Sequence, residues 1–151
     1  MTLALATWFA LAGADTVPDF SLRDLRGKRV ALSDFEGFVL LNFFATWCSS
    51  CSKELPILQR VHEDFGDRGL TVVAVSVDEA RHKSQVQQLV RSNDFSFVVL
   101  TDPASTTVQT INPQKTIPLT LLLNNEREVL WQAHGFEEEE PLRAAVEAAL
   151  Q

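Results

Sequence analysis

Two apolar runs on either side of a helical pattern constrain the fold of this chain more than any other feature. Residues 39–44 and 70–77 are nearly continuous apolar stretches, as in strands that are buried on both faces of a sheet. Between them, residues 49–65 place apolar side chains at helical spacing, and Gly66 and Gly69 follow as helix-ending residues. A strand, a helix and a second strand in this order predict parallel pairing of the two strands.

Shorter patterns add elements at both ends of this unit. The expected elements are an extended stretch from Val17, a small hairpin around residues 26–28, a turn or short helix at 33–37, a helix at 79–93, an extended segment at 95–100, a short helix at 102–108, a hairpin of residues 119–123 and 128–131, and a final helix at 142–150. The late hairpin must be antiparallel. The predicted fold class is therefore α/β, with a mixed central sheet and helices on its faces, whereas the pattern leaves the strand order open.

Composition limits the kind of protein and of partner. The chain has 151 residues, of which 46% are hydrophobic, and this suffices for one domain with a real core, expected over residues 17–151. The net charge of −7 disfavours nucleic acid or anionic lipid as a main partner, because both require clustered Lys and Arg. No apolar run reaches the ~20 residues that cross a bilayer, so we expect no spanning segment in the given chain.

The first residues form a separate segment. Residues 1–14 have no charged side chain and include about a dozen apolar residues, the length of a signal-peptide core. Ala12-Gly13-Ala14 has the small-x-small form of a cleavage site, although no Lys or Arg precedes the apolar run. We therefore expect residues 1–16 to be the remnant of an export signal or lost membrane anchor, which places the domain outside the cytoplasm. The alternative is an N-terminal arm packed on a cytoplasmic domain.

The chain has only two cysteines, Cys48 and Cys51, and they are three positions apart. A disulfide between them encloses a very short loop and adds little stability, so the pair indicates redox chemistry, metal ligation or coincidence. The pair falls where a buried strand meets the following helix. A helix N-terminus stabilises a thiolate, so Cys48 is expected to be the more exposed and acidic thiol and Cys51 the deeper one. This spacing lets one sulfur attack a substrate and the other attack the resulting mixed disulfide.

The residues around this pair resemble a known family. Residues 43–56 read Phe-Phe-Ala-Thr-Trp-Cys-Ser-Ser-Cys-Ser-Lys-Glu-Leu-Pro, which is similar to the active-site pattern of the thioredoxin superfamily and, within it, of the TlpA/ResA-like exported thiol–disulfide oxidoreductases. Val17-Pro18-Asp19-Phe20 resembles the start of that family's N-terminal extension, and Ile117-Pro118 resembles its cis-proline element. The resemblance covers residues 17–150 and implies a thioredoxin-like fold with an N-terminal β-hairpin extension.

The resemblance also implies a role for each part of the site. Cys48 would attack the substrate disulfide, Cys51 would resolve the mixed disulfide, and Glu54 would carry the proton, since Asn42 stands where cytoplasmic thioredoxins have a buried Asp. The alternative for Glu54 is a solvated helix residue. Apart from the redox-active disulfide, no cofactor and no metal is expected.

Three further residues are expected to contact the substrate. Trp47 would shape the surface beside Cys48, Pro118 would form a cis peptide bond, and the backbone of Ile117 would pair with an extended substrate strand. The alternatives are a core position for Trp47 and an ordinary trans bond at Pro118. The expected partners are protein thiols or disulfides and an upstream dithiol electron donor, and we expect a monomer.

Departures from the family pattern limit what the resemblance implies. Ser50 replaces the proline usual before the second cysteine, so the family's reduction potential does not transfer. Residues 112–116 replace the Gly-Val-x-Gly-x-Pro-Glu loop of cytochrome c maturation reductases, which favours general dithiol exchange, with reduction as the expected direction.

Other functions remain open on the sequence alone. A peroxiredoxin needs Thr three residues before its cysteine, and Ala45 holds that position. A metal site needs more ligands than two sulfurs, and the only imidazoles, His62, His82 and His134, fall on separate elements. A redox-inert binding module is the third alternative.

Overall fold

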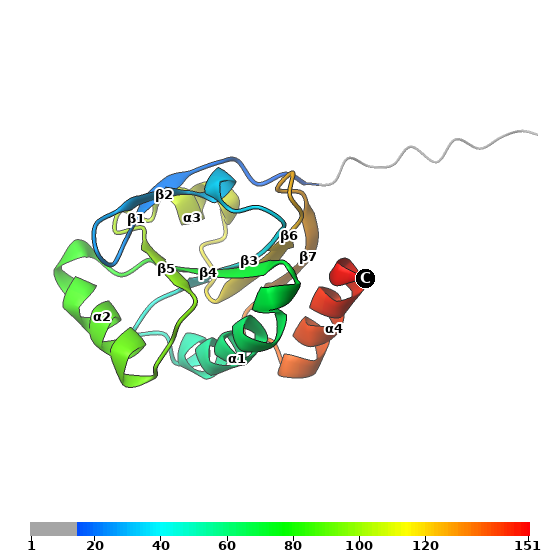
Figure 1. Cartoon of the computed structure of the whole chain (residues 1–151). Helices are drawn as coiled ribbons and strands as arrows, with labels where there is room; N and C mark the ends of the chain where they lie inside the picture. The colour runs from blue at the N-terminus through cyan, green and yellow to red at the C-terminus, as the bar shows by residue number, and fades with distance from the viewer. Residues whose placement is uncertain (1–14) are drawn as a thin grey trace, which may run out of the picture.

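A single mixed sheet of seven strands forms the centre of the computed structural model, which describes residues 15–151 (Figure 1). The strands are β1 (Ser21–Asp24), β2 (Arg29–Ala31), β3 (Phe38–Phe44), β4 (Leu70–Ser76), β5 (Val98–Thr101), β6 (Leu119–Leu123) and β7 (Val129–His134). The helices are α1 (Ser49–Phe65), α2 (Lys83–Ser92), α3 (Thr106–Ile111) and α4 (Glu139–Leu150). The predicted α/β class is confirmed.

The strands lie in the order β2-β1-β5-β4-β3-β6-β7. The predicted parallel pairing of β3 with β4 is confirmed, with Phe38 opposite Leu70 and Phe44 opposite Ser76. The late hairpin of β6 and β7 is antiparallel, as expected, and β6 also pairs antiparallel with β3. The N-terminal hairpin extends the opposite edge of the sheet, where β1 pairs antiparallel with β5.

The two faces of the sheet carry separate apolar cores. On one face, Leu40 and Phe44 of β3 pack with residues of α1, α2 and α4. On the other face, Leu41 and Phe43 pack with residues of α3 and with Val17 and Leu32 of the N-terminal region. Because β3 is covered on both faces, it is apolar at six of its seven positions, and Asn42 is the one polar residue inside it.

Some predicted boundaries differ from the structure. The second helix begins at Lys83, not residue 79, because residues 80–82 form a 3-10 turn. The last helix begins at Glu139, three residues before the predicted start, with Pro141 in its first turn, where proline is tolerated. Glu139 and Glu140 lie in that turn, as expected for acidic residues at a helix N-terminus.

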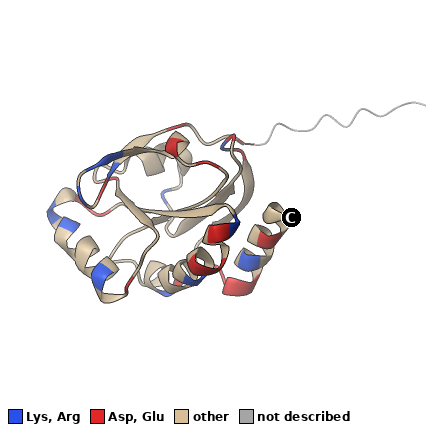
Figure 2. Cartoon of the chain, viewed as in Figure 1, with Lys and Arg blue, Asp and Glu red and all other residues tan. Residues whose placement is uncertain are grey.

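Ion pairs join α4 to α1 and to the 3-10 turn of residues 66–68 that follows α1. Figure 2 shows that both helices carry basic and acidic residues. The pairs are Arg60–Glu139 at 2.7 Å, Arg68–Glu147 at 2.9 Å and Arg143–Asp64 at 2.5 Å. Their side chains are partly exposed, so we attribute the packing of α4 mainly to its buried residues Leu142 and Val146.

The expectation of an export or anchor segment falls almost wholly on residues 1–14, which lie outside the described residues. Within residues 15–151, no helix has the length and apolar character needed to cross a membrane.

Gly37 occupies a backbone position that a larger residue cannot fill. Its φ is +79°, and a Cβ atom there would lie 2.8 Å from the carbonyl oxygen of Gly69, which accepts a hydrogen bond from the Phe38 N–H. We expect Gly37→Ala to lower the free energy of unfolding by about 2–4 kcal/mol, through left-handed backbone strain and overpacking. Urea unfolding measures this loss.

Gly27→Ala is the matched control, because Gly27 has a φ of +87° but an added Cβ there meets nothing within 4 Å. The free energy of unfolding of this control should fall only by the cost of left-handed backbone strain, about 1–2 kcal/mol. Equal losses in the two variants would show that the contact with Gly69 is unimportant.

Candidate active site

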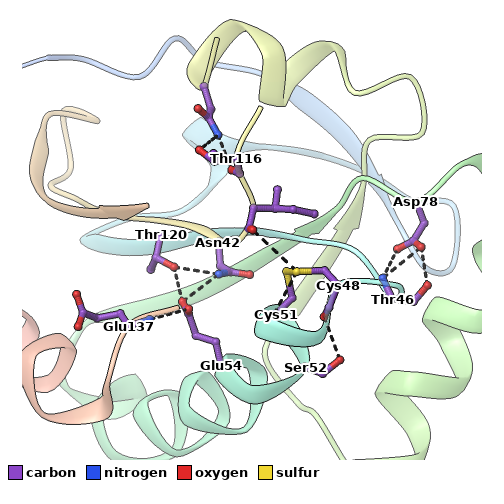
Figure 3. The surroundings of a disulfide bond; sticks show 12 residues. Asn42, Thr46, Cys48, Cys51, Ser52, Glu54, Asp78, Thr116, Thr120 and Glu137 are labelled. Carbon is purple, nitrogen blue, oxygen red and sulfur yellow. Dashed lines mark hydrogen bonds between the residues drawn. A yellow bond between two sulfur atoms is a disulfide. The ribbon is translucent and has the colours of Figure 1, made fainter. Parts of the chain in front are cut away.

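Cys48 and Cys51 form a disulfide at the N-terminus of α1 (Figure 3). Cys48 is the N-cap residue of the helix, and its sulfur accepts a hydrogen bond from the Cys51 N–H at 3.2 Å. Cys51 is 1% exposed, whereas Cys48 is partly exposed. In the reduced protein, the same N–H and the positive end of the helix would stabilise a Cys48 thiolate. The predicted order of the two sulfurs, with Cys51 the deeper, is confirmed.

The loop before β6 faces the disulfide. The Ile117–Pro118 peptide bond is cis, as expected, and the alternative of a trans bond is wrong. Antiparallel pairing of β6 with β3 places Leu119 opposite Phe43, so the residues before Leu119 reach the end of β3 where the cysteines follow. The carbonyl oxygen of Ile117 lies 3.9 Å from the Cys48 sulfur.

The turn that leads into Cys48 is held by an acidic residue that the sequence analysis did not identify. Asp78 is 4% exposed and accepts hydrogen bonds from the Thr46 N–H at 3.0 Å and the Thr46 hydroxyl at 2.6 Å. The Ser76 hydroxyl donates to the same carboxylate at 2.7 Å. The sequence does contain a signal for this contact, because Asp78 follows β4, and the carboxyl ends of parallel strands meet at one sheet edge.

Trp47, the next residue after Thr46, is 71% exposed, so the alternative of a core position for Trp47 is wrong.

Glu54 is buried on the inner side of α1, and the alternative of a solvated residue is wrong, since it is 1% exposed. Its carboxylate accepts hydrogen bonds from the Thr120 hydroxyl at 2.5 Å, the Asn42 side-chain amide at 3.3 Å and the Glu137 N–H at 3.2 Å. Burial raises the pKa of Glu54 above its ordinary value, and the negative charge of Glu137 adds to this rise. The hydrogen bonds from Thr120 and Glu137 oppose it. The site therefore contains a carboxyl group suited to taking up a proton.

The partners of Glu54 were only partly predictable. Asn42 was singled out as the residue in place of a buried Asp, but nothing in the pattern of residues 119–123 marked Thr120 as a hydrogen-bond partner. Both residues are buried on strands that pair with each other, where Asn42 lies opposite Thr120. Figure 3 shows their side chains converging on Glu54.

The three histidines lie on separate elements, in α1, in the turn before α2 and in β7. In the part of the chain that the structure describes, no three His, Cys, Asp or Glu side chains are grouped so that they could hold a metal ion.

Comparisons with known proteins agree with this geometry. Residues 14–132 match the AhpC/TSA family. The chain is 30% identical over 126 residues to the thiol-disulfide oxidoreductase ResA of Bacillus thuringiensis subsp. konkukian, covering 83% of this chain and 71% of the relative.

Two solved structures have closely similar folds. A Chlorobium tepidum structure described as thiol:disulfide interchange protein DsbE has a TM-score of 0.82 and 30% identity, covering 91% of this chain and 97% of the other. The peroxidoxin BcpB of Mycobacterium tuberculosis has a TM-score of 0.74 and 25% identity, covering 91% of this chain and 94% of the other. With its Cys-x-x-Cys pair on this fold, the chain belongs to the AhpC/TSA family of the thioredoxin superfamily and, within it, to the TlpA/ResA-like thiol–disulfide oxidoreductases.

Proposed function

We propose that the protein reduces disulfide bonds in other proteins through its Cys48–Cys51 pair. The observation that carries this proposal is the position of the Cys48 sulfur, between the N-terminus of α1 and the Ile117 carbonyl oxygen. The first environment favours the thiolate, which is the nucleophile. The second is a backbone acceptor beside that nucleophile, which can pair with an extended substrate segment.

The reaction proceeds by two exchanges. The Cys48 thiolate attacks one sulfur of the substrate disulfide, which forms a mixed disulfide and releases the other substrate sulfur as a thiolate. Cys51 then loses its proton to Glu54 and attacks the Cys48 sulfur, which leaves the substrate as a dithiol and the protein as the Cys48–Cys51 disulfide. A second dithiol protein reverses these steps and returns the pair to its reduced form.

The same geometry supports roles for the surrounding residues. Pro118 and Ile117 position the incoming polypeptide, and the exposed Trp47 contacts it beside Cys48. We place the domain of residues 17–151 outside the cytoplasm and as a monomer. Reduction is favoured there because oxidation in such compartments is normally left to a stronger oxidant.

The equilibrium of the pair with glutathione tests the direction of the reaction. For a reductase, we expect a reduction potential nearer the roughly −270 mV of thioredoxin than the roughly −120 mV of DsbA. The reduced protein should also reduce a protein disulfide such as that of insulin, in an amount equal to its own dithiol. A potential near that of DsbA would reverse the proposed direction, and no exchange with any disulfide would refute the function itself.

Peroxide reduction is a second candidate function, favoured by the family match and by the similarity to a peroxidoxin. Against it, position 45, three residues before Cys48, is a buried Ala whose carbonyl oxygen accepts the Cys48 N–H at 3.2 Å, so no hydroxyl group is supplied there. We expect reduced protein to consume hydrogen peroxide no more than about tenfold faster than a thiol of equal acidity. Stopped-flow measurement checks this rate. Consumption several orders of magnitude faster, dependent on Cys48 alone, would establish a peroxidase.

A further inference from the structure

The side-chain amide of Asn42 has a buried oxygen, Oδ1, with no hydrogen-bond partner among residues 15–151. Both hydrogens of the amide nitrogen are used, one by Thr120 Oγ1 at 3.0 Å and one by Glu54 Oε1 at 3.3 Å. Turning the amide around would set its oxygen against the carboxylate of Glu54, which is an acceptor, so these two contacts fix its orientation. A fully buried acceptor without a donor is rare and unfavourable.

This oxygen is directed toward the redox pair (Figure 3). Asn42 is on the face of β3 that is covered by α1, between Leu40 and Phe44, and both of these pack in one core cluster with Cys51. Its contact with Glu54 ties it to α1 one turn after Cys51. In Figure 3, the oxygen of the Asn42 amide points toward the disulfide and away from Thr120.

The disulfide has no hydrogen to donate to this oxygen, but its reduced form does. Reduction by a dithiol partner breaks the S–S bond, adds two electrons and two protons, and leaves two thiols, while the partner becomes the disulfide. The Cys51 S–H is then a buried donor on the side of the redox pair that faces Asn42. We propose that Asn42 Oδ1 accepts a hydrogen bond from Cys51 in the reduced protein, so that Asn42 is a positioning residue that stabilises the dithiol relative to the disulfide.

This inference rests on the proposed function, in which the pair cycles between the two states. It deepens that function in two ways. The bond raises the reduction potential above the value that the same pair would have in an apolar core. It also holds Cys51 as a thiol directed at the Asn42–Glu54 pair until the mixed disulfide forms, so that the proton of Cys51 lies close to the carboxylate that takes it.

The test compares the glutathione equilibrium of the full chain with that of Asn42→Leu, which has a similar volume and no acceptor. We expect the variant to shift about threefold to tenfold toward the disulfide, which corresponds to a potential lower by roughly 15–30 mV. Thr120→Val is the matched control, because it removes a hydroxyl that bonds both Asn42 and Glu54 but leaves Oδ1 in place. Because Thr120 bonds Glu54, we expect a smaller shift in this variant than in Asn42→Leu. An equal shift in the two variants would assign the effect to the hydrogen bonds of Glu54 and would overturn the inference.

A second measurement does not depend on the stability of Asn42→Leu. In the Cys48→Ser variant, Cys51 is the only thiol of the chain, and its S–H stretching band should lie at the lower frequency of a hydrogen-bonded thiol. A band at the frequency of a free thiol, or an unchanged glutathione equilibrium in Asn42→Leu, overturns the inference. Neither measurement requires turnover of a protein substrate, so a failure of the proposed function would be seen separately, as absent exchange with substrate disulfides.

Discussion

A Cys48→Ser variant is expected to lose disulfide reduction on the order of a thousandfold or more. Serine has almost the same size, but its hydroxyl is not ionised near neutral pH and lacks the nucleophilicity of a thiolate. The backbone N–H of Cys51 and the helix terminus that stabilise the Cys48 sulfur would have no thiolate to act on. Insulin reduction, followed by turbidity, measures the loss.

The Cys51→Ser variant provides the matched comparison. It keeps the attacking sulfur at the helix N-terminus and lacks the buried one, so the first exchange proceeds and the second does not. We expect it to accumulate mixed disulfides with substrate proteins that dithiothreitol releases, whereas Cys48→Ser accumulates none. If Cys48→Ser traps partners and Cys51→Ser does not, Cys51 is the attacking residue and the proposed order is reversed.

Much of the fold was predictable because its central unit is buried on both faces. The continuous apolar runs of β3 and β4 and the helical spacing of α1 predicted the strand–helix–strand unit and its parallel pairing. The strand order could not be predicted, because the short β1–β2 hairpin has no sequence pattern that selects β5 as its neighbour. The start of α4 was predicted too late, because its first turn is polar. The start of α2 was predicted too early, because residues 80–82 form a 3-10 turn before it.

The candidate site was predicted where its residues follow one another in the chain and less completely where strand pairing assembles it. One motif at the start of α1 contains Cys48, Cys51 and Glu54. Their helical spacing alone predicts that the three side chains lie on one side of the helix, with Cys48 at its N-terminus. Thr120 bonds Glu54 because β6 pairs with β3, and Asp78 holds Thr46 because β4 ends at the same sheet edge. Such contacts depend on tertiary pairing, which the local pattern of a strand does not encode.

The buried carboxyl group of Glu54 leads to the second large effect. Glu54→Gln should slow resolution of the mixed disulfide on the order of a hundredfold near neutral pH, because the amide cannot take the proton of Cys51. Burial raises the pKa of Glu54, so the folded protein binds its proton more tightly than the unfolded chain. Wild-type stability therefore falls, relative to Glu54→Gln, as the pH rises from the ordinary glutamate pKa through the raised one.

Glu63→Gln is the control for both measurements, because Glu63 lies on the exposed side of the same helix, where its carboxylate accepts a hydrogen bond from the Gln59 side-chain amide. It should change neither the resolution rate nor the dependence of stability on pH. Stopped-flow release of a preformed mixed disulfide gives the rate, and urea unfolding across the acidic and neutral range gives the stability. An unchanged rate in Glu54→Gln together with the expected stability change would mean that Glu54 is buried for structural reasons and that Cys51 loses its proton to another group. If Glu54→Gln changes neither the resolution rate nor the dependence of stability on pH, the pKa of Glu54 is not raised. Both effects depend on the same desolvation, which makes the ionised form of Glu54 costly to bury and its carboxylate a better proton acceptor.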